Sequence, residues 1–583
     1  MSRHNTPQSS TDPASDPHAD YDYRNDDTNR PEVVAALEPR IDGDVRFDTY
    51  TRELYATDAS AYEQLPIGVV SPVSTADVAT VVRYCADKEI PVLPRGGGTS
   101  LAGQAVNEAV VLDFKRHMDE FVSFDPDEET ARAQPGITIA RLNDRLSGHG
   151  LKFAPDPAWG DKSVLGGAIG NNTTGAHSLK YGKTDAYVEE CEVVLADGTV
   201  TTFGWVDVAD LHDRADRVAE MADPGLEDRV YAEVSRILRE ETDEIEARYP
   251  DLKRNVSGYN LDHLLENARE HDAVNLGRLL AGSEGTLAVI TEAEVSLEPI
   301  PDSKAVVLLT YDGVIPAMRD VAPILEHDPS AVEVMDDVML DLARNTGEFA
   351  DLVATLPEGT DSTLLVEFYA DSMDEARRKI ADLLADRLPG YEAAVEPSES
   401  HLETSADTHA IDALEAYDPD RQAKFWKMRK SGLPILLSRT GDDKHWPFVE
   451  DTAVPPEHLP EYVADLQDLF DSHDTFAAYY AHAGPGVLHI RPLLNLKAAD
   501  GIETMEAISE AVTDRVIEYG GSVSGEHGDG RARTKYNRKL YGEDLWQTFR
   551  ELRTAFDPDW LLNPGNVCGD HDPSQRLRYD AGY

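Results

Sequence analysis

The feature that most constrains this chain is a glycine triplet at the point where a short apolar run ends. Residues 90–104 read IPVLPRGGGTSLAGQ, so an expected strand breaks at Arg95 into Gly96–Gly98 and then into two hydroxyl side chains. Glycine has no Cβ and tolerates positive φ, so the backbone N–H groups of such a loop can close on an anion. The run matches neither the dinucleotide-binding fingerprint nor the P-loop. Alone, it fits either a phosphate-binding loop or a tight surface turn.

Three further stretches favour the phosphate-binding interpretation. Residues 155–182 form a second run rich in glycine and asparagine, residues 282–291 lead from a glycine turn into a β-branched strand, and Asn563-Pro564-Gly565 lies near the C-terminus. Together with the triplet, they resemble the FAD-binding dehydrogenases of the vanillyl-alcohol oxidase and para-cresol methylhydroxylase superfamily. The resemblance is to the branch of D-lactate, glycolate and D-2-hydroxyglutarate dehydrogenases, and it covers roughly residues 45–567.

The resemblance implies an α+β fold with a two-part FAD-binding domain of the para-cresol methylhydroxylase type. A second α+β domain with an antiparallel sheet would cover the substrate as a cap, and strand-helix repeats after residue 301 agree with it. The expected divisions are a disordered acidic tail at 1–30, the FAD-binding domain at 31–300 with a helical insertion at about 206–254, the substrate or cap domain at 301–520, a C-terminal segment at 521–567 that carries the metal and catalytic motif back to the FAD domain, and a tail at 568–583.

Carried over motif by motif, the resemblance also implies which residues hold the cofactor. The implied FAD-binding residues are Arg95, Gly96, Gly97, Gly98, Thr99, Ser100, Gly103, Gln104, Pro155, Gly166, Gly167, Asn171, Asn172, Gly175, Glu284, Gly285, Ile290 and Asn563. The stretch from Arg95 to Ser100 would bind the pyrophosphate, Glu284 would lie near the adenine side, and Asn563 would lie beside the cofactor. Relatives that bind flavin covalently have a histidine at the position of Gly98, so the FAD is expected to be non-covalent.

A second constellation lies in the C-terminal third. His482 and His489 belong to HAGPGVLHIRP, and Glu526 and His527 belong to SGEHGDG. Two imidazoles and one carboxylate are typical ligands of Zn²⁺ or Mn²⁺, although two of 18 histidines can be seven residues apart by chance. The resemblance implies that His482, His489 and Glu526 bind the metal and that His527 is the catalytic base, with an ordinary imidazole pKa near ~6.5.

If the substrate is a 2-hydroxy acid, as the resemblance implies, a cationic side chain is also needed to bind its carboxylate. The resemblance assigns this role to Arg429 in FWKMRKSG, and a guanidinium can bind a carboxylate through two hydrogen bonds. With Lys427 and Lys430 nearby, the same arginine could instead belong to a solvated basic helix face. Three weaker candidates for this role are Lys444, Arg491 and Arg531, while Glu450 and Asp451 are interpreted as structural.

Composition limits the classes of partner. The chain has 54 Lys and Arg against 110 Asp and Glu, a net charge of -56, which argues against electrostatic binding to nucleic acid or to an anionic membrane. Such acidity favours a halophilic protein over an ordinary acidic one. No apolar run reaches the ~18 residues of a membrane span, and residues 1–30 lack the regions of a secretory signal, so a cytoplasmic location is expected. Three isolated cysteines exclude an iron–sulfur cluster held within this chain alone.

These observations predict an FAD- and divalent-metal-dependent dehydrogenase. It would oxidise a D-2-hydroxy acid, of the D-lactate, glycolate or D-2-hydroxyglutarate type, to the 2-oxo acid by hydride transfer to flavin. Its electrons would pass to a quinone, an electron-transfer flavoprotein or a separate iron–sulfur protein. Two alternatives stay open: a flavin subunit of a larger electron-transfer complex, and an enzyme that oxidises another alcohol. The chain departs from many relatives at Pro485, where they have aspartate, but this removes no expected ligand.

Overall fold

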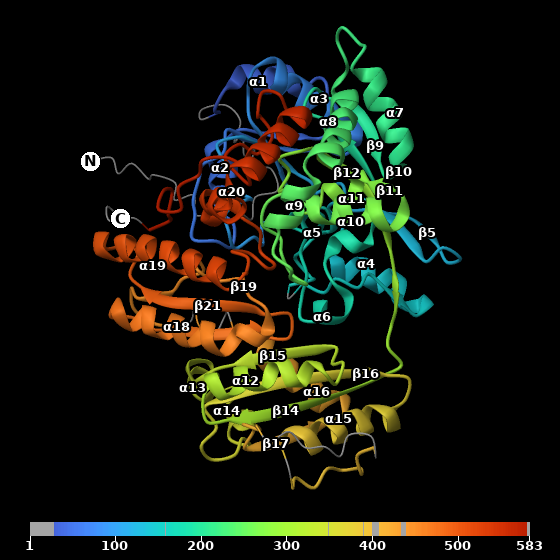
Figure 1. Ribbon diagram of the computed structural model, residues 1–583. Coiled ribbons are helices and arrows are strands. Elements are labelled where there is room, and N and C mark those ends of the chain that lie inside the picture. Colours follow the sequence, from blue (N-terminus) through green and yellow to red (C-terminus); the bar gives the residue numbers. More distant parts are fainter. Residues whose placement is uncertain are drawn as a thin grey trace, which may run out of the picture.

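A computed structural model describes residues 28–157, 159–347, 349–388, 390–398, 407–432, 436 and 439–579. The chain forms two halves, which Figure 1 shows one above the other. The first half comprises residues 28–299 together with residues 521–579, and the second half comprises residues 303–520. Most of the expected N-terminal tail lies outside the described residues. Within the described residues, no helix combines the length and the apolar character needed to cross a membrane.

The first half contains the glycine triplet. Its elements are α1 (Pro31–Leu37), β1 (Asp44–Arg46), α2 (Thr49–Leu54), β2 (Gly68–Ser71), α3 (Thr75–Asp87), β3 (Val92–Arg95), β4 (Val110–Asp113), β5 (Phe121–Asp125), β6 (Thr130–Ala133), α4 (Ile139–Leu146), η2 (Ser147–His149), β7 (Leu151–Lys152), α5 (Leu165–Asn171), α6 (Ser178–Tyr181), η3 (Thr184–Tyr187), β8 (Val188–Val194), β9 (Val200–Phe203), β10 (Trp205–Asp207), α7 (Val208–Val218), α8 (Leu226–Glu240), α9 (Thr242–Arg248), α10 (Leu261–His271), β11 (Ala273–Asn275), α11 (Leu276–Leu279), β12 (Val289–Ser296), β13 (Glu298–Pro299) and α20 (Gly530–Phe556).

Two sheets organise this half. The first has the order β1-β2-β4-β3, in which the β2–β4 and β3–β4 pairs are parallel. Helix α3 begins at the Ser74 cap, whose hydroxyl accepts a hydrogen bond from the N–H of Asp77, and it buries an apolar stripe that includes Val78 and Val82. The second sheet is antiparallel, with the order β5-β6-β12-β8-β9. After α20, Asn563 donates its backbone N–H to Val92, so the C-terminal segment returns to the edge of the first sheet.

The second half is built on one larger sheet. Its elements are β14 (Ser303–Tyr311), α12 (Val314–Leu325), β15 (Ala331–Met335), α13 (Asp337–Arg344), α14 (Ala350–Val353), β16 (Ser362–Ala370), α15 (Met373–Arg387), β17 (Asp412–Ala416), α16 (Pro419–Lys430), β18 (Lys444–His445), β19 (Thr452–Ala453), η5 (Pro456–His458), α18 (Leu459–Ser472), β20 (Ala477–His482), β21 (Val487–Leu494) and α19 (Ala499–Glu518). The sheet has the order β17-β14-β16-β15-β20-β21-β18, with β19 on β21, and its pairs are antiparallel. The expected antiparallel sheet of an α+β fold is therefore present.

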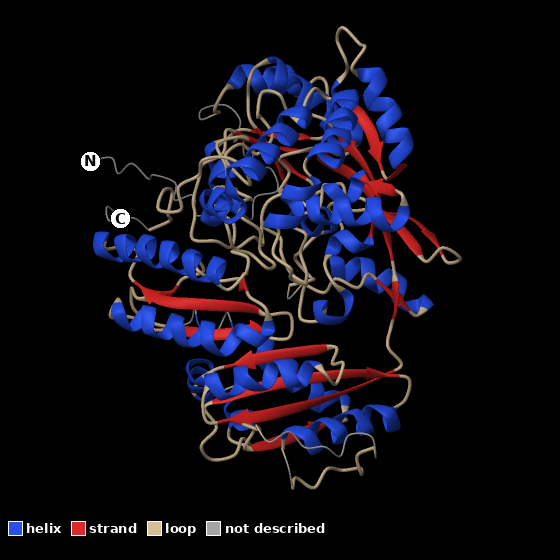
Figure 2. Cartoon of the chain, in the orientation of Figure 1, coloured by secondary structure: helices blue, strands red, loops and turns tan. Residues whose placement is uncertain are grey.

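Strand alternation gives this sheet two different faces. Val332 and Val334 of β15 pack with α12, α15, α18 and α19, whereas Ala331 and Met335 pack with α13, α14 and α16. Figure 2 shows helices lying against the sheets of both halves. The residue between the two valines, Glu333, points to the α16 side. Because β20 and β21 alternate in the same way, the polar residues of three strands meet on one face of the sheet.

Candidate active site

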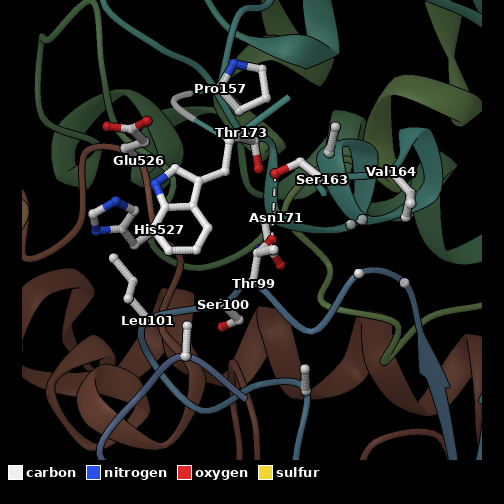
Figure 3. A pocket seen from close by; sticks show the side chains of 18 of the residues that line it. Thr99, Ser100, Leu101, Pro157, Ser163, Val164, Asn171, Thr173, Glu526 and His527 are labelled. Atoms are coloured by element: carbon white, nitrogen blue, oxygen red, sulfur yellow. Dashed lines mark hydrogen bonds between the residues drawn. The ribbon is translucent and has the colours of Figure 1, made fainter. Parts of the chain in front are cut away.

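One cavity of about 240 Å³ lies between the two halves. One side of it, here called the glycine wall, comprises the cavity-lining residues of 94–105, 156–176 and 283–290. The opposite side, here called the charged wall, comprises Glu333, Arg429, Tyr480, His482, His489, Glu526 and His527. Figure 3 shows Glu526 and His527 beside the same pocket as Thr99 and Ser100. The two groups of residues singled out in the sequence therefore meet in one space, although hundreds of residues separate them along the chain.

The cavity contains most of the predicted cofactor residues. Those that line it are Arg95, Gly96, Gly97, Gly98, Thr99, Ser100, Gln104, Gly166, Gly167, Asn171, Gly175, Glu284, Gly285 and Ile290. Four others, Gly103, Pro155, Asn172 and Asn563, do not line the cavity. All five predicted catalytic and metal-binding residues line it: Arg429, His482, His489, Glu526 and His527.

The glycine triplet packs closely against the second glycine-rich run. A Cβ on Gly96 would lie 2.5 Å from Cγ2 of Val164, and a Cβ on Gly97 would lie 2.3 Å from the carbonyl oxygen of Lys162. Gly98 has φ +63°, which favours glycine. Glycine is therefore required in the triplet for two reasons: the positive φ of Gly98 lets the chain turn after the strand, and the missing Cβ atoms of Gly96 and Gly97 let the two loops pack together. It is not an isolated surface turn.

The side chain of Arg95, which lines the cavity, is bound mainly to backbone carbonyl groups. Its guanidinium donates hydrogen bonds to the carbonyl oxygens of Tyr55 (3.0 Å), Ala105 (2.8 Å) and Thr57 (2.8 Å). These contacts hold the loop to the segment after α2 and use three N–H groups of the guanidinium. Arg95 thus stabilises the loop, and because the Ser100 hydroxyl donates to Oε1 of Gln104, the backbone N–H groups of the loop are the main donors for an anion.

Asn563 is fully buried and contacts the cavity only through its neighbours. Its side-chain amide donates to the carbonyl oxygens of Gln104 (3.0 Å) and Glu284 (2.8 Å), which line the cavity. Gln104 in turn donates to the carbonyl oxygen of His527 at 2.7 Å, and Glu284 accepts from the N–H of Asp529 at 2.6 Å. Asn563 therefore joins the loops of the glycine wall to one another, and Gln104 and Glu284 join that wall to the loop of His527.

The metal-ligand candidates come together through strand pairing. His482 ends β20 and His489 lies in β21, and these two strands form an antiparallel pair. Glu526 approaches from the loop before α20, with Oε2 3.0 Å from Nε2 of His482 and 3.7 Å from Nε2 of His489. All three residues are buried. Since two imidazole nitrogens and one carboxylate oxygen converge in the cavity, the donor set suits a divalent metal.

Electrostatics favours the ligand forms of these groups. Burial alone would raise the pKa of Glu526, but the neighbouring His482 and Arg254 lower it well below its usual range. Burial lowers the pKa of His489 well below 6.5, and the charges of His482 and His527 lower it further. An ionised carboxylate and a neutral imidazole are the forms that coordinate metal ions.

A second combination of possible ligands shares part of this set. Ligand atoms of Asp451, His489, Glu526 and His527 lie within 4.8 Å of one another. However, Oδ2 of Asp451 already accepts from Ser524 Oγ at 2.6 Å and from the backbone N–H groups of Glu526 (3.1 Å) and His527 (2.7 Å). This carboxylate therefore shapes the loop that presents Glu526 and His527, in keeping with the structural interpretation of Asp451. We favour His482 as the third ligand.

Two carboxylates, of Glu450 and Asp451, lie beside Nδ1 of His527. Its Nδ1 lies 3.2 Å from Oε1 of Glu450 and 3.9 Å from Oδ1 of Asp451, and its ring stacks on His489 with 5.0 Å between centroids. Burial alone would lower the pKa of His527, but these two acids raise it to about 9. The fold therefore shifts this pKa upward from the ordinary imidazole value near ~6.5. Both acids lie on the Nδ1 side of the ring, which leaves Nε2 for a reacting group.

Arg429 is not part of a solvated helix face. It lies near the end of α16 with only 5% of its surface exposed, whereas Lys430 beside it is exposed. Its NH2 lies 2.7 Å from Oε2 of Glu333, and its guanidinium lies over the ring of Tyr480 at 5.0 Å. The weaker candidates Lys444, Arg491 and Arg531 do not line the cavity.

Two buried charged residues near the proposed metal ligands, Glu333 and Arg254, were not predicted from the sequence. Glu333 contacts both His482 and Arg429, and Arg254, which is fully buried, places NH1 3.5 Å from Oε2 of Glu526. One signal for Glu333 was available, because its strand AVEVM has a single charge within an apolar run. The lysine and arginine around position 254 showed no comparable pattern.

Comparisons with known proteins agree with these observations. A family model for an FAD binding domain matches residues 66–204, and a model for the C-terminal domain of FAD linked oxidases matches residues 300–567. The chain is 34% identical to a D-2-hydroxyglutarate dehydrogenase of Pantoea ananatis over 91% of its own length and 50% of that protein's. It is 26% identical to the glycolate oxidase subunit GlcD of Bacillus subtilis, over 91% of this chain and 95% of that one. The chain thus spans about half the length of the D-2-hydroxyglutarate dehydrogenases that it matches.

Solved structures share the fold. A 4-ethylphenol oxidase from Gulosibacter chungangensis has a TM-score of 0.62 at 15% identity, with 94% of this chain and 98% of that chain covered. An alkyldihydroxyacetonephosphate synthase has a TM-score of 0.61 at 18% identity, covering 93% and 85%. A p-cresol methylhydroxylase has a TM-score of 0.59 at 13% identity, covering 93% and 97%. At these identities the likeness concerns the fold alone.

Proposed function

Because the chain belongs to the FAD-linked oxidases of the vanillyl-alcohol oxidase and para-cresol methylhydroxylase superfamily, we propose that it is an FAD- and divalent-metal-dependent dehydrogenase of D-2-hydroxy acids. Its substrate would be of the D-lactate, glycolate or D-2-hydroxyglutarate type, and its product would be the 2-oxo acid. One observation carries this proposal: a single cavity joins the glycine wall to a buried set of two histidines and one glutamate.

The glycine wall fits a flavin. A Cβ on Gly96 or Gly97 would meet the neighbouring loop, and Gly98 provides no nucleophile for a covalent bond. Backbone N–H groups of the loop and the Thr99 hydroxyl would bind the phosphates non-covalently, while the Ser100 hydroxyl donates to Oε1 of Gln104. Bound FAD would supply the acceptor for the two electrons and the hydrogen removed from the substrate.

The charged wall fits a divalent metal. His482, His489 and Glu526 would hold it, and Oε2 of Glu526, the oxygen that faces Nε2 of both histidines, is buried without a hydrogen-bond partner within the described part of the chain. A bound Zn²⁺ or Mn²⁺ would supply a Lewis acid that lowers the pKa of the substrate hydroxyl, and its charge would also lower the pKa of His527.

The remaining chemistry belongs to side chains of the charged wall. Arg429 would bind the substrate carboxylate through a charge-assisted hydrogen bond. His527 would take the hydroxyl proton, and it must be neutral at Nε2 to do so. Glu450 and Asp451 lie beside its Nδ1, and their charges would keep the ring oriented toward the cavity. The final electron acceptor would be a quinone, an electron-transfer flavoprotein or a separate iron–sulfur protein.

Anaerobic flavin bleaching tests this function. The FAD-loaded protein would be mixed with D and L forms of lactate, 2-hydroxyglutarate and other 2-hydroxy acids, and with glycolate, while flavin absorbance is followed. We expect at least one D acid or glycolate to bleach the flavin and the L forms to leave it oxidised. Failure of every acid, with dithionite still reducing the flavin, would refute the proposed function.

A further inference from the structure

Glu333 is a charged residue in a place where charges are costly. It is the central residue of β15, it is fully buried, and its strand neighbours on both sides are apolar. An isolated carboxylate at such a depth would be strongly destabilising, so its presence requires partners that compensate for the lost water. Among the described residues, Glu333 has two partners, His482 and Arg429, and both belong to the charged wall.

The first partner is His482. Its Nδ1 lies 2.8 Å from Oε1 and 3.0 Å from Oε2 of Glu333, so the proton of a neutral ring stays on Nδ1. The lone pair then lies on Nε2, the nitrogen that is 3.0 Å from Glu526 in the proposed metal site. A carboxylate behind a ligand histidine orients the ring and increases its basicity.

The second partner is Arg429. Oε2 of Glu333 lies 2.7 Å from its NH2, which places the guanidinium against the ring of Tyr480. Nε and NH2 of Arg429 are both buried without a hydrogen-bond partner among the described residues, so the contact with Glu333 is an ion pair. Glu333 thus positions the guanidinium by charge and leaves its N–H donors for a ligand.

We propose that Glu333 is a shared positioning residue, whose one carboxylate orients the metal ligand His482 and the carboxylate-binding Arg429 together. Metal affinity and binding of the substrate carboxylate are therefore coupled through Glu333. This inference rests on the proposed function, because that function assigns the roles of His482 and Arg429.

A buried ion pair could instead serve only stability. The neighbouring strand offers a matched comparison, because Glu367 of β16 is also fully buried and also binds a histidine. Its Oε1 lies 2.7 Å from Nε2 of His177, and its Oε2 accepts from the indole of Trp426 at 2.8 Å. Neither of these partners belongs to the proposed metal set. A purely structural role would give the two glutamates similar effects.

The experiment compares Glu333→Gln with Glu367→Gln in the full chain loaded with FAD. Zn²⁺ or Mn²⁺ alone is titrated into the chelator-treated proteins and followed by calorimetry, which needs no turnover. We expect Glu333→Gln to weaken metal binding ~10- to 100-fold, the usual effect of removing a carboxylate behind a ligand histidine, and Glu367→Gln to leave it within ~3-fold. Parental affinity in Glu333→Gln, or equal weakening in both variants, would overturn the proposal.

The coupling is tested with Arg429→Gln and the double variant. If one carboxylate serves both partners, Glu333→Gln raises the KM of the reactive 2-hydroxy acid, and the two substitutions together raise it by less than the product of their single effects. Independent, multiplicative effects would overturn the coupling.

Two further results keep the test decisive. If Glu333→Gln does not fold, Glu333→Asp and Glu367→Asp replace the pair, because aspartate keeps the charge but has a shorter side chain. Weaker metal binding in Glu333→Asp but not in Glu367→Asp supports the proposal. Parental metal binding in both variants refutes it. Should no 2-hydroxy acid reduce the parental flavin, the proposed function fails, while the metal titration still decides whether Glu333 orients the metal ligand.

Discussion

The two walls of the cavity are built in different ways. The glycine wall comes from runs in which glycines are close in sequence, and several of these glycines leave no room for a Cβ atom. The charged wall consists of long buried side chains from β15, α16, β20, β21 and the loop before α20. The glycine wall thus depends on room for close packing, and the charged wall depends on buried charge. Substitutions in the first wall should therefore change FAD affinity, and substitutions in the second should change the rate of flavin reduction or the binding of substrate.

The largest effect should come from the charged wall. We expect His527→Ala to bind FAD like the parent but to slow flavin reduction by the reactive 2-hydroxy acid ~100- to 10,000-fold, the scale of losing a general base. Stopped-flow flavin absorbance measures this, and dithionite reduction at the parental rate is the control. A near-parental rate with substrate would exclude His527 as the base.

A smaller effect should come from the same wall through binding. Arg429→Gln removes a charge-assisted hydrogen bond to the substrate, so we expect KM to rise about tenfold to hundredfold. Lys424→Gln is a suitable control because Lys424 is exposed on the same helix and does not line the cavity. Steady-state kinetics with the same acceptor would compare them, and equal KM values would show that Arg429 does not bind the carboxylate.

The glycine wall should respond in the opposite way. A Cβ on Gly175 would lie 1.8 Å from the carbonyl oxygen of Asp156, whereas one on Gly148 would meet no atom within 4 Å. Because overpacking costs ~1–3 kcal/mol, we expect Gly175→Ala to weaken FAD binding by roughly 5- to 150-fold and Gly148→Ala to leave it unchanged. Fluorescence titration of apoprotein with FAD provides the affinities. If Gly175→Ala slowed reduction yet kept full FAD affinity, the two walls would not be separable.

The smallest expected effect concerns the contact between His177 in the first half and Glu367 in the second half. Burial alone would lower the pKa of His177, but its hydrogen bonds with Asp156 and Glu367 raise it to about 9. Because the folded value exceeds the unfolded one, this contact contributes its full stability below pH ~6.5 and loses it as the pH rises through ~9. His177→Asn should therefore be less stable than the parent, by on the order of 2 kcal/mol, at pH ~6.5. Denaturant unfolding across this window should show the gap closing, and a constant gap would contradict the role of His177.

The same contrast explains what the sequence could predict. The triplet at Gly96–Gly98 and the pair Glu526-His527 are local patterns, and the family resemblance was enough to place them in one site. Glu333 and Arg254 act through partners reached only by strand pairing and loop packing, whose register no local pattern in a single chain reveals. The contacts of Arg95 were missed for a similar reason, since its acceptors are backbone carbonyls with no signature in sequence.

In the proposed reaction, the glycine wall and the charged wall act on one molecule at the same time. The decisive experiment adds Zn²⁺ or Mn²⁺ stepwise to chelator-treated protein that keeps its full FAD, and records anaerobic flavin reduction with the reactive D-2-hydroxy acid at each step. We expect the fraction of fast-reduced flavin to rise in proportion to added metal and to saturate at one ion per flavin. Full and fast reduction before any metal is added would contradict this joint action of the two walls.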